Sequence, residues 1–283
     1  MSECNHDCAS CASKKEGTCG GEQDFRAKAN EGSNVRKVVA VMSGKGGVGK
    51  SLVTELLAVC AAKRGLKVGV LDADVTGPSI PTAFGVTDKA QTDGTSLFPI
   101  ESSKLKVKVM SINLLVENPN DPVVWRGPVL AGVVKQFWSD VAWGDLDVMF
   151  VDMPPGTGDV PLTVFQSLPV DAAVVVTSPQ DLVAMIVGKA VRMADMMKIP
   201  VKGLVENMAS FRCPDCGKVH RIFGEGNGEV TAGTYGIPEY VSLPIDPALA
   251  ASVDAGKVEE VDASALNTIL DAVLSSAKPA ESK

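Results

Sequence analysis

The sequence Gly-Lys-Gly-Gly-Val-Gly-Lys-Ser at residues 44–51 constrains the fold more than any other feature of this chain. It satisfies the pattern G-x-x-x-x-G-K-[ST], in which glycines let the backbone wrap a phosphate and the following helix N-terminus adds a positive dipole. An apolar β-branched run at 38–42 precedes the pattern and a helical pattern at 50–64 follows it. A plain glycine turn is a poor alternative in that context, so we expect a phosphate-binding loop.

Beyond this loop, short apolar runs alternate with helical patterns, which predicts an α/β fold with a doubly wound, mainly parallel sheet flanked by helices. The runs are apolar throughout, as expected of strands buried on both faces. We expect further strands at 68–71, 107–112, 148–151, 173–177, 201–206 and 240–243, and further helices at 129–139, 182–198, 229–235 and 263–275.

The loop and its first helical turn are expected to bind the nucleotide. Within the pattern, Lys50 reaches the β- and γ-phosphates and Ser51 binds Mg²⁺. No N-K-x-D guanine signature follows, so ATP is the favoured nucleotide. The residues expected to contact it here are Gly44, Lys45, Gly46, Gly47, Val48, Gly49, Lys50, Ser51 and Leu52.

Acidic residues follow two of the expected strands. Asp152 comes directly after the run 148–151, whereas Asp72 and Asp74 follow the run 68–71. A doubly wound fold places functional carboxylates at such strand ends, where they hold Mg²⁺ and orient water in phosphoryl transfer. We therefore interpret Asp152 as the Walker B acid, with helix capping or turn formation as the alternative for each aspartate.

The charge balance argues against several partners. The chain has 34 acidic and 27 basic side chains, a net charge of -7, which repels nucleic acid and anionic lipid surfaces. No apolar run approaches the roughly 18 residues of a membrane helix, and the N-terminus lacks a signal-peptide profile. We expect a cytoplasmic protein that binds neither nucleic acid nor a membrane.

Cys213 and Cys216 form a C-x-x-C, whose spacing lets both sulfurs face one metal. A four-thiolate site needs two more cysteines, from elsewhere in the chain or from a second copy across a two-fold axis. The spacing leaves Zn²⁺ and an iron–sulfur cluster open, and His220 is a possible third zinc ligand or a surface residue.

The N-terminal segment is rich in cysteine. We expect a second cluster there, with a redox-sensing or zinc-binding tail as the alternative. Its four cysteines are Cys4, Cys8, Cys11 and Cys19. Cys60 stands alone in an apolar helical pattern and is interpreted as a core residue.

Taken together, the motifs resemble the Mrp/ApbC family of P-loop ATPases, iron–sulfur cluster carriers and scaffolds related to MinD and nitrogenase iron protein. The segments that carry the resemblance are SGKGGVGKS at 43–51, LDAD at 71–74, GPS at 77–79, WRGP at 125–128, VDMPPGTGD at 151–159, VENM at 205–208 and C-x-x-C at 213–216.

The resemblance implies ATP, Mg²⁺ and a 4Fe-4S cluster held between the C-x-x-C motifs of a homodimer. ATP hydrolysis would be coupled to cluster loading or transfer, and apo iron–sulfur proteins would receive the cluster. The implied roles are Lys45 reaching the other subunit's phosphates, Asp74 activating water, Asp72 near the metal and Asn207 contacting adenine.

Three departures from the family pattern stand out. Leu52 replaces a usual Thr, Thr76 replaces a common Tyr, and the first spacing of the N-terminal cysteines is shorter.

The alternative function is a MinD/ParA-like positioning ATPase with a structural zinc knuckle. That function needs a basic amphipathic terminal helix, and residues 262–271 have no basic face. An electron-donating ATPase like nitrogenase iron protein would hold its cluster with cysteines from two separate loops.

The expected domain organisation has three parts. Residues 1–34 contain few large apolar side chains and are expected to form a Cys-rich, largely disordered arm. Residues 35–277 form the P-loop ATPase domain with the C-x-x-C, and residues 278–283 have the composition of a frayed tail.

Overall fold

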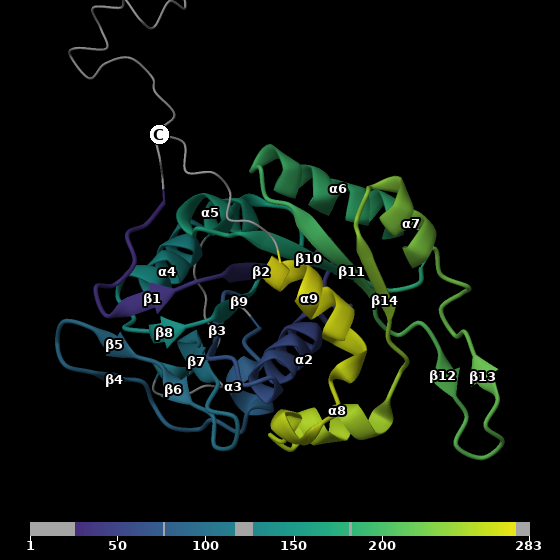
Figure 1. Cartoon of the computed structure of the whole chain (residues 1–283), viewed down its shortest axis with the longest axis horizontal. Coiled ribbons are helices and arrows are strands. Elements are labelled where there is room, and N and C mark those ends of the chain that lie inside the picture. Colours follow the sequence, from purple (N-terminus) through teal and green to yellow (C-terminus); the bar gives the residue numbers. More distant parts are fainter. Residues whose placement is uncertain (1–25, 76, 117–126, 181–182, 276–283) are drawn as a thin grey trace, which may run out of the picture.

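The computed structural model describes residues 26–75, 77–116, 127–180 and 183–275. Its centre is an eight-stranded sheet in the order β14-β11-β10-β2-β9-β3-β7-β6 (Figure 1). All neighbouring strands are parallel except β6, which runs antiparallel to β7. In sheet order the strands are Glu239–Ser242, Val201–Glu206, Ala172–Thr177, Val38–Ser43, Val148–Asp152, Val68–Asp72, Lys108–Met110 and Ile100–Glu101. The predicted fold class is confirmed.

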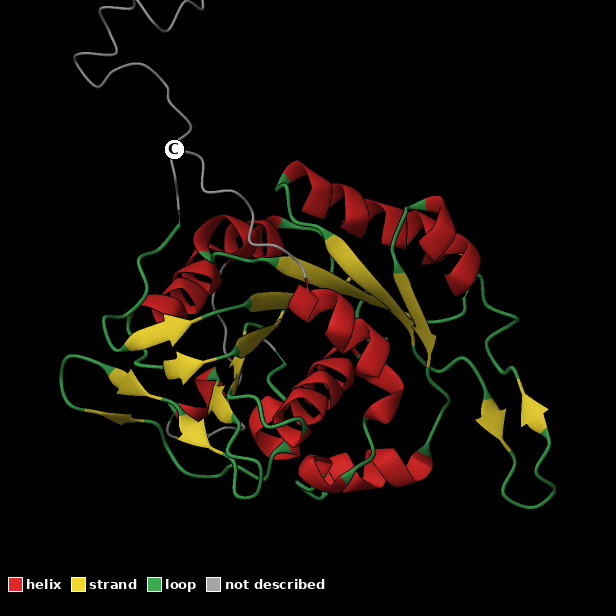
Figure 2. Cartoon of the chain, in the orientation of Figure 1, coloured by secondary structure: helices red, strands yellow, loops and turns green. Residues whose placement is uncertain are grey.

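Helices cover both faces of the sheet, which makes the fold doubly wound (Figure 2). On one face lie α2 (Lys50–Lys63), α3 (Ile80–Ala83), α8 (Pro247–Asp254) and α9 (Asn267–Ser275). On the other face lie α4 (Gly127–Ser139), α5 (Asp159–Ser167), α6 (Val183–Met196) and α7 (Gly228–Thr234).

The two faces are separate hydrophobic cores joined through the strands. In β2, Val38, Ala40 and Met42 pack into the core under α4–α7, while Val39 and Val41 pack into the core under α2 and α9. This alternation follows from the two-residue period of a strand. Because every residue of β2 is buried, its sequence is apolar with the exception of Ser43. The phosphate loop therefore starts from the rigid centre of the molecule.

Smaller elements surround the sheet. The expected strand at 107–112 is shorter because a 3₁₀ turn, Ile112–Leu114, follows Ser111. Further 3₁₀ turns are Val258–Glu260 and Ser264–Leu266, the second of which precedes α9. Short two-stranded pairs are β1 (Ser33–Val35) with β8 (Gly144–Leu146), β4 (Gln91–Thr92) with β5 (Leu97–Phe98), and β12 (Phe211–Arg212) with β13 (Val219–His220).

Residues 26–34, placed in the disordered arm from composition, lie against the domain. The backbone N–H of Ala27 donates to the Ser167 carbonyl over 2.7 Å, and the Trp138 indole N–H donates to the Ala27 carbonyl over 3.1 Å. Ala27 and Ala29 pack on the core under α4 and α5, so small side chains suffice to attach this segment. The remainder of the expected arm, 1–25, and the tail, 278–283, lie outside the described residues.

None of the helices in the described part of the chain combines the length and the apolar character needed to span a membrane.

Candidate functional site

The phosphate loop joins the end of β2 to the start of α2. Gly47 and Gly49 adopt φ values of 78° and 82°, a left-handed backbone that favours glycine. A Cβ on Gly49 would lie 2.2 Å from Asn207 Nδ2, so close packing also requires glycine there. At the outer edge of the loop, the half-exposed Lys45 donates a hydrogen bond to Oε1 of Gln180. The loop has the shape that the sequence predicts.

Lys50 and Asp152 form a buried ion pair beneath this loop. Lys50 Nζ lies 2.8 Å from Asp152 Oδ2 and 3.7 Å from Asp74 Oδ2. The side chains of Lys50 and Asp152 are 6% and 1% exposed. Such a pair depends on good geometry, because both charges have lost their water. The charge of the lysine is thus balanced by these two aspartates.

Two hydroxyls of α2 complete the surroundings of Asp152. Ser51 Oγ donates to Asp152 Oδ2 over 2.6 Å, and Thr54 Oγ1 donates to Oδ1 over 2.8 Å. Ser51 and Asp152 thus present neighbouring oxygens at the loop, and oxygen ligands of this kind suit Mg²⁺. The donor set fits the expected cation.

Asp72 is adjacent to Asp152 in the β3–β9 pair, in which the two residues are register partners. Its carboxylate accepts hydrogen bonds from Ser111 Oγ over 3.0 Å and from the backbone N–H of Asp74 over 3.2 Å. Burial, together with the charge of Asp152, raises the pKa of Asp72 well above its ordinary value. The structure thus brings Asp72, Asp74 and Asp152 together around Lys50.

Glu55 belongs to the same region, although its motif context does not reveal it. It lies one helical turn after Ser51 and is 1% exposed. Oε2 of Glu55 is buried and has no hydrogen-bond partner among the residues that the structure describes. Burial, then the charges of Asp152 and Asp72, raise the pKa of Glu55 well above its ordinary value, and Lys50 opposes this shift. An acid on the buried face of an expected helix is the sequence signal that could have identified it.

Asn207 follows β11 and reaches the phosphate loop from the side. Its Nδ2 donates to the Val48 carbonyl over 3.0 Å, and its Oδ1 accepts from the backbone N–H of Met208 over 2.9 Å. The side chain is 4% exposed. The structure therefore places Asn207 against the phosphate loop.

Cys213 and Cys216 lie on a hairpin formed by β12 and β13, which we call the cysteine hairpin (residues 211–220). It projects from the edge of the molecule (Figure 1). The turn is closed by hydrogen bonds from Cys213 N to the Lys218 carbonyl and from Gly217 N to the Cys213 carbonyl, both 2.9 Å. Cys213 is half-buried and Cys216 is exposed.

The turn of the hairpin favours the thiolate form of Cys213. The backbone N–H groups of Cys216 and Asp215, then the Cys216 side chain, hydrogen-bond to the Cys213 sulfur and lower its pKa. Among the described residues, no group of three or more His, Cys, Asp or Glu side chains could hold a metal ion. The exposed His220 does not complete such a set, so within the described residues the hairpin offers two thiols and no third ligand.

The remaining cysteines lie either outside the described residues or in the core. Cys4, Cys8, Cys11 and Cys19 lie outside the described residues. Cys60 is a buried residue of the core under α2, as expected, and its thiol lies 3.1 Å from Asn267 Oδ1. Burial raises the pKa of Cys60, the opposite of the effect at Cys213.

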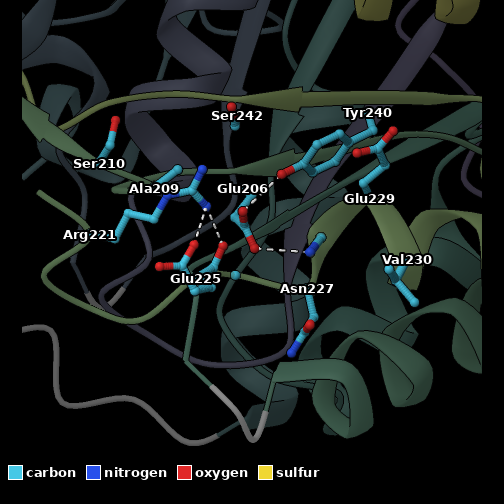
Figure 3. A pocket seen from close by; sticks show the side chains of 12 residues that line it. Glu206, Ala209, Ser210, Arg221, Glu225, Asn227, Glu229, Val230, Tyr240 and Ser242 are labelled. Atoms are coloured by element: carbon cyan, nitrogen blue, oxygen red, sulfur yellow. Dashed lines mark hydrogen bonds and ion pairs between the residues drawn. The ribbon is translucent and has the colours of Figure 1, made fainter. Parts of the chain in front are cut away.

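A polar cavity of about 470 Å³ lies between the sheet edge and the chain that leaves the cysteine hairpin (Figure 3). The buried Glu206 is at its base, where its carboxylate accepts from Tyr240 Oη over 2.8 Å and from the backbone N–H of Gly228 over 3.1 Å. Burial and the bond to Glu206 raise the pKa of Tyr240, so the phenol stays protonated and donates. The sequence patterns do not indicate this cavity.

A phosphate loop between a central strand and a helix, with a Walker B aspartate on the adjacent strand β9, defines a P-loop NTPase. More narrowly, the chain belongs to the family described as ParA, NUBPL iron-transfer P-loop NTPase, which matches residues 34–277. The resemblance found in the motifs is thereby confirmed.

Similar proteins agree with this assignment. The iron-sulfur cluster carrier protein of Clostridium perfringens is 45% identical over 267 residues, 89% of this chain and 93% of the relative. The solved nucleotide-binding protein of Archaeoglobus fulgidus in complex with ADP is 47% identical, with a TM-score of 0.73 over 81% of this chain and 89% of that one. The cell division ATPase MinD of Pyrococcus furiosus, at 21% identity and a TM-score of 0.58 over 84% and 98%, shares the fold.

Proposed function

We propose that this protein is an ATP-dependent carrier of iron–sulfur clusters. Two copies would hold a 4Fe-4S cluster between their Cys213 and Cys216 thiolates and pass it to apo-proteins in the cytoplasm. The observation that carries the proposal is the cysteine hairpin, which presents two accessible thiols, one of lowered pKa, with no further ligand among the described residues. A carrier needs such an accessible and incomplete site, because its cargo must enter and leave.

The nucleotide site would serve as the switch. ATP phosphates would draw the Lys50 ammonium away from Asp152 and Asp74, with which it pairs in this structure. Ser51 and Asp152 would hold Mg²⁺, which supplies electrostatic stabilisation of the phosphates, and Asp72 lies beside them. Asp74, released from Lys50, would orient the attacking water and accept its proton.

Lys45 would act across a homodimer. Its half-exposed side chain lies at the outer edge of the loop, where the ammonium donates a hydrogen bond to the amide oxygen of Gln180. A lysine placed there can reach the phosphates bound by a second copy and stabilise the charge that develops during transfer. The same two-fold arrangement would bring together the paired cysteine hairpins.

Base recognition would fall to Asn207, whose amide lies against the loop carbonyl of Val48. The proposed partners are a second copy and recipient apo-proteins; neither nucleic acid nor a membrane is expected, because the net charge of -7 disfavours both.

The test is transfer of a reconstituted cluster to the apo form of a 4Fe-4S enzyme, followed by the return of that enzyme's activity. Cys213→Ala should abolish transfer and keep ATP binding. Asp215→Asn is the matched control, because it alters the same turn and keeps both thiols. Unchanged transfer by Cys213→Ala would exclude this hairpin as the cargo site.

A further inference from the structure

Glu206 and Asn207 are consecutive residues at the end of β11, and they hold two different parts of the protein. Asn207 contacts the phosphate loop, whereas Glu206 contacts the segment that leaves the cysteine hairpin, residues 221–228, which we call the hairpin stem. We propose that Glu206 is a positioning residue that couples nucleotide binding to the reactivity of Cys213 and Cys216. This inference rests on the proposed function, since it takes the cysteine pair as the cargo site.

The contact with the phosphate loop is close and specific. Asn207 Nδ2 donates to the Val48 carbonyl over 3.0 Å, and Gly49 leaves no room for a Cβ beside the same nitrogen. The backbone N–H of Asn207 also bonds to the Thr177 carbonyl over 2.8 Å. A change in the backbone of residues 48–49 on phosphate binding would therefore displace the Asn207 side chain directly.

The contact with the hairpin stem is equally close. Gly228 N–H bonds to Glu206 Oε1, and Gly226 has a φ of 74°. A Cβ on Gly226 would lie 2.6 Å from Glu206 Oε2, and a Cβ on Gly228 would lie 2.4 Å from Tyr240 Cε2. The stem backbone at Gly226 and Gly228 thus packs closely against the carboxylate, and Tyr240, beside Gly228, donates to the same carboxylate.

The part of the stem nearer the cysteines is more exposed. Arg221 pairs with Glu225 of its own segment, over 3.2 Å between Nη1 and Oε2, and both side chains are largely exposed. The cavity of about 470 Å³ lies between this pair and Glu206 (Figure 3). The stem is therefore held to the core where Gly228 bonds to Glu206, and its Arg221–Glu225 pair lines the outer side of the cavity.

The entering side of the hairpin is held differently. Ala209 N–H bonds to the Leu243 carbonyl over 2.9 Å, and Ile245 N–H bonds to the Ser210 carbonyl over 2.7 Å. With this side held on the chain after β14, movement transmitted through Glu206 would change the angle of the hairpin relative to the domain. Close-packed contacts transmit such displacements because they cannot be compressed.

The test measures how fast N-ethylmaleimide alkylates Cys213 and Cys216 in the reduced, metal-free, full-length protein, with peptides identified by mass spectrometry. Rates are compared with and without Mg²⁺ and a non-hydrolysable ATP analogue. In the wild type, the nucleotide should change the rate by about fivefold or more, the scale of ordinary coupling between sites. In Glu206→Ala the change should disappear, while the Kd for the analogue stays within about threefold.

Glu206→Gln is the matched rescue, because its amide can still accept from Gly228 N–H and bond to Tyr240. It should retain the nucleotide effect, which a merely destabilising substitution would not predict. If Glu206→Ala fails to bind nucleotide, Tyr240→Phe is tested in its place, since it removes one hydrogen bond to Glu206 and keeps the carboxylate. In that variant the nucleotide-dependent change in alkylation rate should fall by at least about half.

The inference is overturned if the nucleotide leaves the alkylation rate of the wild type unchanged. It is also overturned if the nucleotide changes that rate in Glu206→Ala as much as in the wild type, or does so in Tyr240→Phe where Glu206→Ala cannot bind nucleotide. These measurements use no iron, so they are independent of cluster transfer. A wild type that shows the nucleotide effect on alkylation but transfers no cluster would count against the proposed function and leave this inference standing.

Discussion

The hydroxyl of Thr54 donates to Oδ1 of the buried Asp152 over 2.8 Å, which leaves Oδ2 for Lys50 and Ser51. Each oxygen of this carboxylate therefore has its own donors, and the acid is held in one orientation. Thr54 lies two positions after Leu52, so a hydroxyl reaches the site from this turn of α2 although Leu52 provides none. The hydroxyl supports the acid rather than the phosphates.

Thr54→Val should loosen Asp152, because valine has the same shape and leaves Oδ1 of a fully buried carboxylate without this donor. We expect a loss of about 1–3 kcal/mol in the free energy of unfolding and weaker Mg²⁺-dependent nucleotide binding. Denaturant unfolding and a Mg²⁺–ADP titration measure the two effects. Thr54→Ser keeps the hydroxyl and should behave as the wild type; equal behaviour of the valine variant would show that the bond has no role.

Lys45→Ala should separate binding from hydrolysis. Lys50, Ser51 and the loop backbone remain, so the affinity for ADP should change little. In the proposed homodimer the variant would lose a charge supplied in trans, so kcat for ATP should fall by about tenfold or more. Steady-state phosphate release and equilibrium titration provide both numbers. Lys28→Ala, at a side chain 87% exposed, is the control. A fall in ADP affinity with unchanged kcat would contradict the role assigned to Lys45.

Glu55→Gln should change how stability depends on pH. A carboxyl whose pKa is raised in the folded state holds its proton more tightly there than in the unfolded chain. The folded state therefore loses stability as pH rises from the ordinary glutamate pKa towards the raised one. Burial and the negative charges of Asp152 and Asp72 disfavour the ionised Glu55, whereas the positive charge of Lys50 favours it.

The glutamine variant removes this titration and should lose stability less steeply over that interval, measured by urea unfolding of metal-free protein. Asp72 contributes a slope of the same sign and remains in the variant. Glu225→Gln, at a side chain 87% exposed, should keep the wild-type slope. Identical slopes for Glu55→Gln and the wild type would show that Glu55 does not carry the extra proton.

The strands could be predicted from the sequence because burial on both faces makes them continuously apolar, as in Ala172–Thr177. Helix α8 was missed because none of its residues is fully buried, which removes the apolar period. Its start had a signal nonetheless: Asp246 caps the backbone N–H groups of Ala248 and Leu249, and Pro247 occupies the first turn.

The residues of the candidate site differ in the same way, because some follow from local motifs and others depend on tertiary packing. Lys50, Ser51 and Asp152 follow from local motifs, since the loop and the adjacent strand end specify them. For Glu55 the sequence offers one signal, an acid on the buried face of an expected helix, but its neighbours Asp72 and Asp152 come from two separate strands. The Glu206–Tyr240 pair could not be predicted, because it depends on a contact between β11 and β14. Burial of an acid is a tertiary property.

The most direct test of the central claim is the iron, sulfide and zinc content of the protein after anaerobic reconstitution, per dimer, in the wild type and in Cys213→Ala/Cys216→Ala. The N-terminal cysteines remain in both proteins, so the difference isolates the cysteine hairpin. We predict that the variant loses about four iron and four sulfide ions per dimer relative to the wild type. Zinc alone in the wild type, or iron and sulfide unchanged by the variant, would contradict a bridging cluster at Cys213 and Cys216.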